Sequence, residues 1–261
     1  MAVVQKYSLG TPCWFELGTT DQTAAKQFYS QLLGWSARDN PMGPNEVYTM
    51  FQLNGHDTGA VYTLPAKMVE QGVPPHWNVY FAAPDVDVSA ARVSELGGVL
   101  VQPPFDVLDA GRMAICRDPG GASFSLWQAR RHPGAAVINE NNAVCWSELY
   151  TRDLARVCEF YTGLFGWETK SSANMSTYIE FSAGGQPRGG MMQMEEEFKG
   201  MPSQWGIHFM VEDCDAATAK VRELGGMVRH GPFSAPGVGR LAMLADPQGA
   251  GFSLITLLAA T

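Results

Sequence analysis

The stretch CWFELGTTDQTAAKQFYSQLLGW, residues 13–35, decides the fold because it returns as CWSELYTRDLARVCEFYTGLFGW at residues 145–167. Both copies read as a short strand, an aspartate suited to cap a helix, a helix with a Phe-Tyr pair, and a closing Gly-Trp. The copies stay 132 positions apart throughout. A fixed offset held across a strand and a helix is an internal repeat. The chain therefore contains one domain written twice.

A second unit follows each of these stretches. It begins with a strand at 77–83, continues through a helix closed by two glycines at 97–98, and ends in strands near 99–103, 112–117 and 122–128. Its copy begins at Trp205, 128 positions after Trp77, so the first half carries four extra residues between positions 35 and 77. Each half thus predicts two units of one strand, one helix and three strands, four βαβββ modules in an α+β fold.

These repeats also divide the chain. We expect a first domain at residues 1–130, a linker at 131–142 and a second domain at 143–261. The linker is rich in asparagine and carries Pro133 and Gly134, as connecting segments often do.

The composition argues against several classes of protein. A net charge of −8 without a block of Lys or Arg argues against nucleic acid, because phosphate binding needs clustered cations. No apolar run approaches the roughly 20 residues of a membrane span, and the N-terminus lacks the features of a signal peptide. The five cysteines are odd in number and have no C-x-x-C spacing, which is typical of reduced thiols. We expect a cytoplasmic monomer or homodimer that binds no membrane and no nucleic acid.

Three paired motifs carry a resemblance to a known superfamily. The first is Asp-x₆-Phe-Tyr with its following Gly-Trp; the second is Glu-Leu-Gly-Gly at 95–98 and 223–226; the third is Gly-Arg-x₅-Asp-Pro-x-Gly at 111–121 and 239–249. With these motifs in this order, the chain resembles the vicinal-oxygen-chelate superfamily (glyoxalase, bleomycin resistance protein and dioxygenase). It looks similar to two-domain glyoxalase-like members that are often labelled hydroxylases. The resemblance implies two cup-shaped mixed sheets, each able to hold a ligand or a metal.

The same resemblance implies where a metal would be held. Members of the superfamily bind a divalent metal through His, Gln or Glu on the first strand of each module and through Glu on a last strand. Carried over by motif, these positions hold Trp14, Asn78, Trp146 and Gly206 on the first strands, and Ser125 and Ser253 on the last. Indole and glycine offer no donor, and Asn and Ser bind divalent cations weakly without carboxylates. We therefore expect no metal and no other cofactor.

Strand alternation predicts what lines the cups instead, because residues i and i+2 share a face. The predicted lining residues, each two positions from a former metal position, are Glu16, Tyr80, Trp127, Glu148 and His208. This lining is aromatic, with one carboxylate in each half. It suits a flat, partly apolar small molecule that a few polar groups orient.

The tryptophans and carboxylates each have a functional and a structural interpretation. Trp14 and Trp146 either stack on a ligand, together with Asn78, or fill the core. Glu16 and Glu148 act as general acids or bases, or anchor a ligand, and burial would raise their pKa unless they are paired. In the structural interpretation they bond to backbone or to arginine.

The remaining candidates are similarly open. His208 and Glu148 form a proton relay or a shifted metal site, or His208 is a satisfied core histidine. Arg112 and Arg240 either hold an anionic ligand group or form salt bridges with neighbouring strands. Our hypothesis is a metal-independent protein that binds a small molecule. The alternative is a lyase, isomerase or oxygenase, either metal-free through Glu16 or Glu148 or with an atypical metal site at Glu148 and His208.

Overall fold

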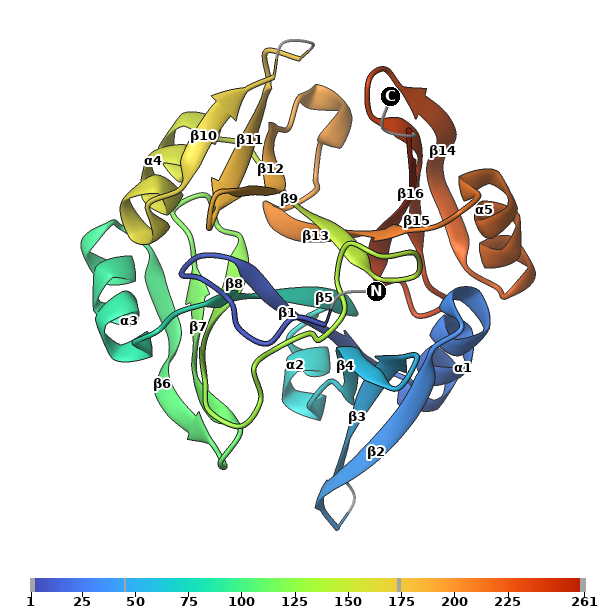
Figure 1. The fold of residues 1–261 in the computed structure, drawn as a ribbon, viewed down its shortest axis with the longest axis horizontal. Coiled ribbons are helices and arrows are strands. Elements are labelled where there is room, and N and C mark those ends of the chain that lie inside the picture. Colours follow the sequence, from blue (N-terminus) through green and yellow to red (C-terminus); the bar gives the residue numbers. More distant parts are fainter. Residues whose placement is uncertain (1–2, 45, 173–174, 259–261) are drawn as a thin grey trace.

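The computed structural model describes residues 3–44, 46–172 and 175–258, which form two eight-stranded mixed sheets (Figure 1). The first sheet has the order β2-β3-β4-β1-β5-β8-β7-β6 and the second the order β10-β11-β12-β9-β13-β16-β15-β14. The strands of the first sheet are β1 (Pro12–Thr19), β2 (Ser36–Gly43), β3 (Glu46–Leu53), β4 (His56–Thr63), β5 (His76–Ala82), β6 (Val99–Val107), β7 (Gly111–Arg117) and β8 (Ser123–Ala129). Those of the second are β9 (Val144–Thr151), β10 (Glu168–Ser171), β11 (Tyr178–Ala183), β12 (Gln186–Gln193), β13 (Gln204–Met210), β14 (Met227–Ala235), β15 (Gly239–Ala245) and β16 (Gly251–Leu257).

Each sheet joins two βαβββ modules through their first strands. β1 pairs antiparallel with β5, and β9 with β13, while each of these four strands runs parallel to the last strand of its own module. The predicted four-module α+β fold is confirmed. None of the helices in the described ranges is long and apolar enough to span a membrane.

One helix per module packs on its sheet, and an aspartate caps each helix. The helices are α1 (Gln22–Leu33), α3 (Val86–Glu95), α4 (Leu154–Phe165) and α5 (Cys214–Glu223). The side chains of Asp21, Asp85, Asp153 and Asp213 each accept the backbone N–H three residues later. Gly34 and Gly166 end α1 and α4 in the left-handed conformation, with φ of 68° at both. The caps expected at Asp21 and Asp153 are therefore present, and Asp85 and Asp213 cap α3 and α5 in the same way.

Two elements of the first half were not indicated by the sequence pattern. β2 is solvent-exposed along almost its whole length and has no apolar face, and α2 (Ala66–Glu70) is only five residues long. The four extra residues of the first half divide between these two regions. Tyr48 and Tyr178 are 130 positions apart, so two residues fall before β3, and the other two fall in the α2 connection before Trp77. In the second half a 3₁₀ helix, η1 (Glu196–Phe198), takes the place of α2.

The two sheets lie back to back, and their concave faces open away from each other (Figure 1). β5 packs against β13 where the backs meet, α1 lies beside α5, and α3 lies beside α4. An aromatic cluster fills this interface; for example, the Phe81 and Trp205 rings lie 5.0 Å apart. The main core therefore lies between the sheets, on the faces opposite the two cups.

Side chains from the repeated motifs fasten the two domains together. Trp77 Nε1 donates to the Tyr29 hydroxyl at 3.0 Å, and this hydroxyl donates to Asp246 Oδ2 in the other domain at 3.1 Å. The copy has Trp205 Nε1 donating to Tyr161 at 2.9 Å, and Tyr161 donating to Asp118 at 3.0 Å. The Phe-Tyr and Asp-Pro-x-Gly motifs thus meet across the interface, as two Trp–Tyr–Asp clamps.

Candidate functional site: two aromatic cups

The first cup contains a buried carboxylate surrounded by aromatic side chains. Trp14 Nε1 donates to the Tyr48 hydroxyl at 3.0 Å, and the Tyr80 hydroxyl donates to the Glu16 carboxylate. The β1–β5 register places Trp14 opposite Tyr80, so these side chains share one face of the sheet. Glu16 is 7% exposed and Trp14 only 3%. Tyr62 covers Gly18 on the same face. A Cβ atom added to Gly18 would lie only 2.9 Å from the Tyr62 hydroxyl.

The second cup repeats this arrangement with one change. Trp146 Nε1 donates to the Tyr178 hydroxyl at 2.9 Å, and Tyr178 donates to Glu148 Oε2 at 2.9 Å. His208 takes the position of Tyr80, opposite Trp146 in the β9–β13 register. His208 Nε2 lies 3.8 Å from Glu148 Oε2, too far for a hydrogen bond, and neither ring nitrogen has a partner. Tyr150 also contacts Glu148 and fills the space above Gly206.

Burial sets the charge of these groups. Desolvation raises the pKa of Glu16 to about 7, against the opposing effect of the hydrogen bond from Tyr80. The pKa increase expected for a buried cup carboxylate is therefore found at Glu16. Desolvation also lowers the pKa of His208, although Glu148 acts in the opposite direction. His208 is 3% exposed and is consequently neutral near pH 7.

The residues at the positions that bind a metal in the superfamily pattern are unsuited to hold one here. Trp14 and Trp146 use their indole N–H groups on tyrosines, Asn78 interacts with the Tyr62 hydroxyl, and Ser253 interacts with Tyr150. Over the described ranges, no three His, Cys, Asp or Glu side chains come together in a way that could hold an ion. Glu148 and His208 supply two donors where protein sites usually supply three or four.

The segment between the domains covers the first cup. The His132 ring packs edge-on against Trp14, with ring centroids 4.4 Å apart, and lies 5.8 Å from the Trp127 ring. Trp127 Nε1 donates to the His132 carbonyl at 2.9 Å. The segment is held in place further along, where the Ala135 N–H donates to the Cys13 carbonyl at 2.7 Å.

Arg112 and Arg240 lie outside both cups. Arg112 forms a two-pronged salt bridge with Asp87 of α3, at 2.8 and 2.9 Å, and also pairs with Asp106. Arg240 forms the matching two-pronged bridge with Asp215 of α5. Both guanidinium groups therefore form salt bridges, but their main partners are helix residues on the back of the sheets, and Arg112 also forms a salt bridge with a neighbouring strand, through Asp106.

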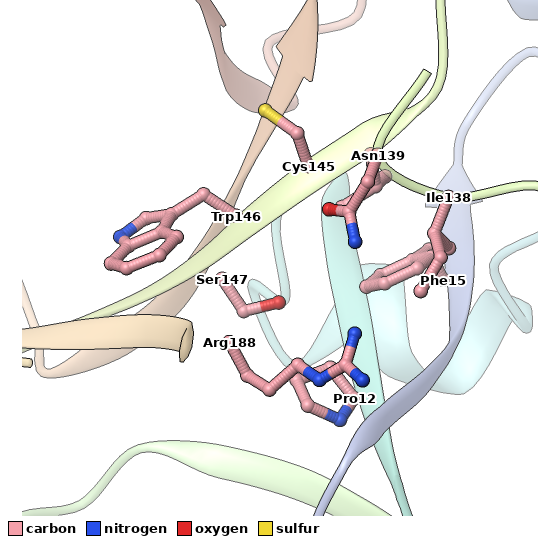
Figure 2. A pocket seen from close by; sticks show the side chains of 9 residues that line it. Pro12, Phe15, Ile138, Asn139, Cys145, Trp146, Ser147 and Arg188 are labelled. Carbon is pink, nitrogen blue, oxygen red and sulfur yellow. The ribbon is translucent and has the colours of Figure 1, made fainter. Parts of the chain in front are cut away.

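Two cavities of the structure lie outside the cups. One of about 20 Å³ sits where β1, β9, β12 and the connecting segment meet, and Arg188 reaches into it toward Pro12 (Figure 2). This volume holds about one water molecule. Figure 2 shows the Trp146 ring turned away from Arg188. A wider cleft of about 400 Å³ lies between the end of α1, the tip of the β3–β4 hairpin and residues 140–142.

Several lining residues were missed by the sequence-based reasoning. Tyr48 and Tyr178, the partners of the two tryptophans, lie more than 30 positions beyond them, on strands whose pairing the sequence does not specify. The sequence did offer one signal for them: Tyr48 and Tyr178 occupy matched positions of the two repeats, and both are tyrosines. His132 gave no signal, since it belongs to a segment without a copy.

The chain matches known families over both halves. Residues 13–126 match the glyoxalase/bleomycin resistance protein/dioxygenase superfamily, and residues 143–255 match the glyoxalase-like domain. A putative glyoxylase of Mycobacterium tuberculosis is 43% identical over 254 residues, which cover 96% of this chain and 96% of that protein. The anthracycline biosynthesis protein DnrV of Streptomyces peucetius is 34% identical over 263 residues, covering 97% of this chain and 95% of that protein.

Solved structures share the fold at low sequence identity. The 2,3-dioxygenase LapB from Pseudomonas sp. KL28 aligns with a TM-score of 0.67 at 13% identity, covering 96% of this chain and 93% of that one. The Mn(II)-bound glyoxalase from Novosphingobium aromaticivorans aligns with a TM-score of 0.67 at 14% identity, covering 96% and 83%. Together with the relatives in sequence, these matches show that the chain belongs to the two-domain branch of the vicinal-oxygen-chelate (glyoxalase/bleomycin resistance protein/dioxygenase) superfamily.

Proposed function

We propose that this protein binds a small, planar, partly apolar molecule in a cup and does so without a metal ion. The observation that carries the proposal is the lining of the second cup. Trp146, Tyr178 and Glu148 form a hydrogen-bonded chain there, beside His208, a nearly inaccessible imidazole with two unpaired nitrogens. Buried polar groups are normally hydrogen-bonded, so unpaired nitrogens on a cup wall favour a ligand that pairs with them.

The relatives give this proposal independent support. One of them is named an anthracycline biosynthesis protein. Anthracyclines, as a chemical class, contain a flat, polycyclic, hydroxylated quinone. A flat molecule of that kind would present a π-face to Trp146 and Tyr178, and hydroxyl or carbonyl groups to Glu148 and His208.

Access to this cup would pass by η1. The Phe198 ring lies 6.4 Å from the Tyr150 ring, and Arg152 Nη2 donates to the Phe198 carbonyl at 2.6 Å and to the Met201 carbonyl at 3.1 Å. A ligand that reached Tyr150 from this side would therefore meet Phe198 first.

Titration with alizarin, a planar dihydroxyanthraquinone, tests the proposal, alongside native mass spectrometry of untreated protein to detect a retained molecule. We expect wild-type protein to bind alizarin, and Trp146→Ala to weaken binding at least tenfold, or about 1.4 kcal/mol. The exposed-acid variant Glu159→Gln serves as the control and should bind as wild type does. A change of less than threefold in Trp146→Ala would make this tryptophan part of the core and remove the anchor of the proposal.

An enzymatic function is the second candidate, and the state of Glu16 favours it. A carboxyl group whose pKa is about 7 is well matched to general acid–base catalysis at neutral pH. On this alternative the protein is a lyase, isomerase or oxygenase that works without metal through Glu16 or Glu148, or with an atypical metal at Glu148 and His208. Stoichiometric metal in freshly purified protein that is lost in His208→Ala would favour the metal version over the binding proposal.

A further inference from the structure

The two cups are not equivalent, although the sequence repeats. Opposite its tryptophan, the first cup has Tyr80, whose hydroxyl is used on Glu16. The second cup has His208, which is 3% exposed and leaves both ring nitrogens without a partner. At this position the first cup has a phenol that is already hydrogen-bonded, whereas the second has an imidazole whose two nitrogens have no partner among the described residues. The second cup therefore offers hydrogen-bonding atoms there that the first does not.

The first cup is moreover already filled. His132 packs against Trp14 and Trp127, and these two rings are only 3% and 6% exposed. The His132 ring has an unpaired Nε2, but this ring is itself what occupies the mouth of the cup. In the second cup Trp146 is partly exposed, and no aromatic ring within the described ranges packs on it.

The walls of the second cup are also more adaptable. Met192 stands beside Tyr150 in the β12–β9 register, and Met243 stands beside Ser253 in the β15–β16 register. The matched residues of the first cup are Tyr62 and Ile115. Unbranched methionine side chains adjust to an irregular apolar ligand better than a fixed phenol or a β-branched residue does.

From this asymmetry, and on the basis of the proposed function, we infer that the second domain alone holds the ligand and that the first domain is a closed structural copy. His208 then determines which ligands bind. A neutral imidazole presents one donor and one acceptor, so it pairs with a hydroxyl or carbonyl on the rim of a planar ligand. The nearby Glu148 carboxylate disfavours a ligand with an anionic group at that point.

Calorimetric titration of alizarin into wild-type protein and three variants tests this inference. We expect a stoichiometry of one ligand per chain. His208→Leu removes both nitrogens and should weaken binding at least tenfold, as loss of a buried hydrogen bond to a ligand does. His208→Gln keeps a donor and an acceptor and should restore the affinity to within about threefold of wild type. Tyr62→Phe, which removes a hydroxyl from the closed cup, should change the affinity less than twofold.

The outcomes separate this inference from the proposed function. Two ligands per chain, an unchanged affinity in His208→Leu, or a loss in Tyr62→Phe equal to that in His208→Leu would overturn the inference while the binding function stood. If wild-type protein neither binds alizarin nor retains a small molecule in native mass spectrometry, the proposed function fails and the inference fails with it.

Discussion

At the scale of single residues, Glu16 and Glu148 show how one repeated position acquires two environments. Both carboxylates are 7% exposed, and both accept a hydrogen bond from a tyrosine. Tyr80 donates to Glu16, whereas the residue matched to Tyr80 is His208, which lies too far from Glu148 to donate. Duplication has thus preserved the carboxylate and changed the group beside it.

The raised pKa of Glu16 predicts how stability depends on pH. Because the pKa is about 7 in the folded protein and near 4.5 when the chain is unfolded, this carboxyl supports the folded state fully below pH 4.5. That support is lost as the pH rises through 7. Glu16→Gln mimics the protonated form at every pH, so its stability relative to wild type should rise by about 1–3 kcal/mol between pH 5 and pH 8.

Urea unfolding of both proteins at the two pH values measures this difference. The exposed-acid variant Glu159→Gln is the matched control, and its stability relative to wild type should be nearly independent of pH. A Glu16→Gln difference that is the same at pH 5 and pH 8 would contradict a proton held by Glu16 in the folded state.

Sequence alternation was sufficient to place Trp14, Glu16 and Glu148 on the inner faces, because strand geometry fixes which side chains share a side. It could not assign their partners. Which hydroxyl meets Trp14 depends on the pairing of β3 with β4 and of β4 with β1, which are contacts between distant segments. His132 is a similar case, since its position depends on the path of a segment without regular structure.

At the scale of elements, strands with a buried apolar face could be predicted, and those without one could not. β1 is buried at all eight positions, whereas β2 lies exposed at the sheet edge, where it pairs with β3 and its Asp39 forms a salt bridge with Lys26 of α1. Helix ends were well marked, because an aspartate cap and a left-handed glycine each act within a few residues. Local signals therefore defined the start and end of α1 and α4 without any knowledge of the sheet.

The glycine that ends α1 provides a test at this scale. Gly34 has a φ of 68°, and a Cβ atom there would meet nothing within 4 Å, so a side chain would add backbone strain and no clash. Gly34→Ala should therefore lower the free energy of unfolding by about 1 kcal/mol. Gly34→Asn should lose less, because asparagine tolerates the left-handed conformation. Urea unfolding measures the free energy of unfolding of both variants. A Gly34→Ala variant as stable as wild type would contradict the expected backbone strain at this position.

At the scale of the whole molecule, the motifs that identify the superfamily serve the interface between the domains. Asp118 and Asp246 each use one carboxylate oxygen on the N–H groups of their own turn and the other on a tyrosine of the opposite domain. Burial raises the pKa of both aspartates. These motifs therefore revealed the fold, while the function has to be sought in the cups, where the motifs place no residue.

Removing one clamp hydroxyl should weaken the whole molecule, because the two domains share a single aromatic interface. Tyr29→Phe leaves Trp77 Nε1 and Asp246 Oδ2 buried and unpaired, and loss of such partners costs about 2–3 kcal/mol. Tyr161→Phe should cost a similar amount, since Tyr161 accepts from a tryptophan of its own domain and donates to an aspartate of the other, just as Tyr29 does. The two clamps use different residues at separate places, so the double variant should lose about the sum of the two. Urea unfolding followed by tryptophan fluorescence measures all three. A Tyr29→Phe variant that keeps wild-type stability would show that the clamp contributes orientation alone, and the association of the domains would then rest on the stacked rings around it.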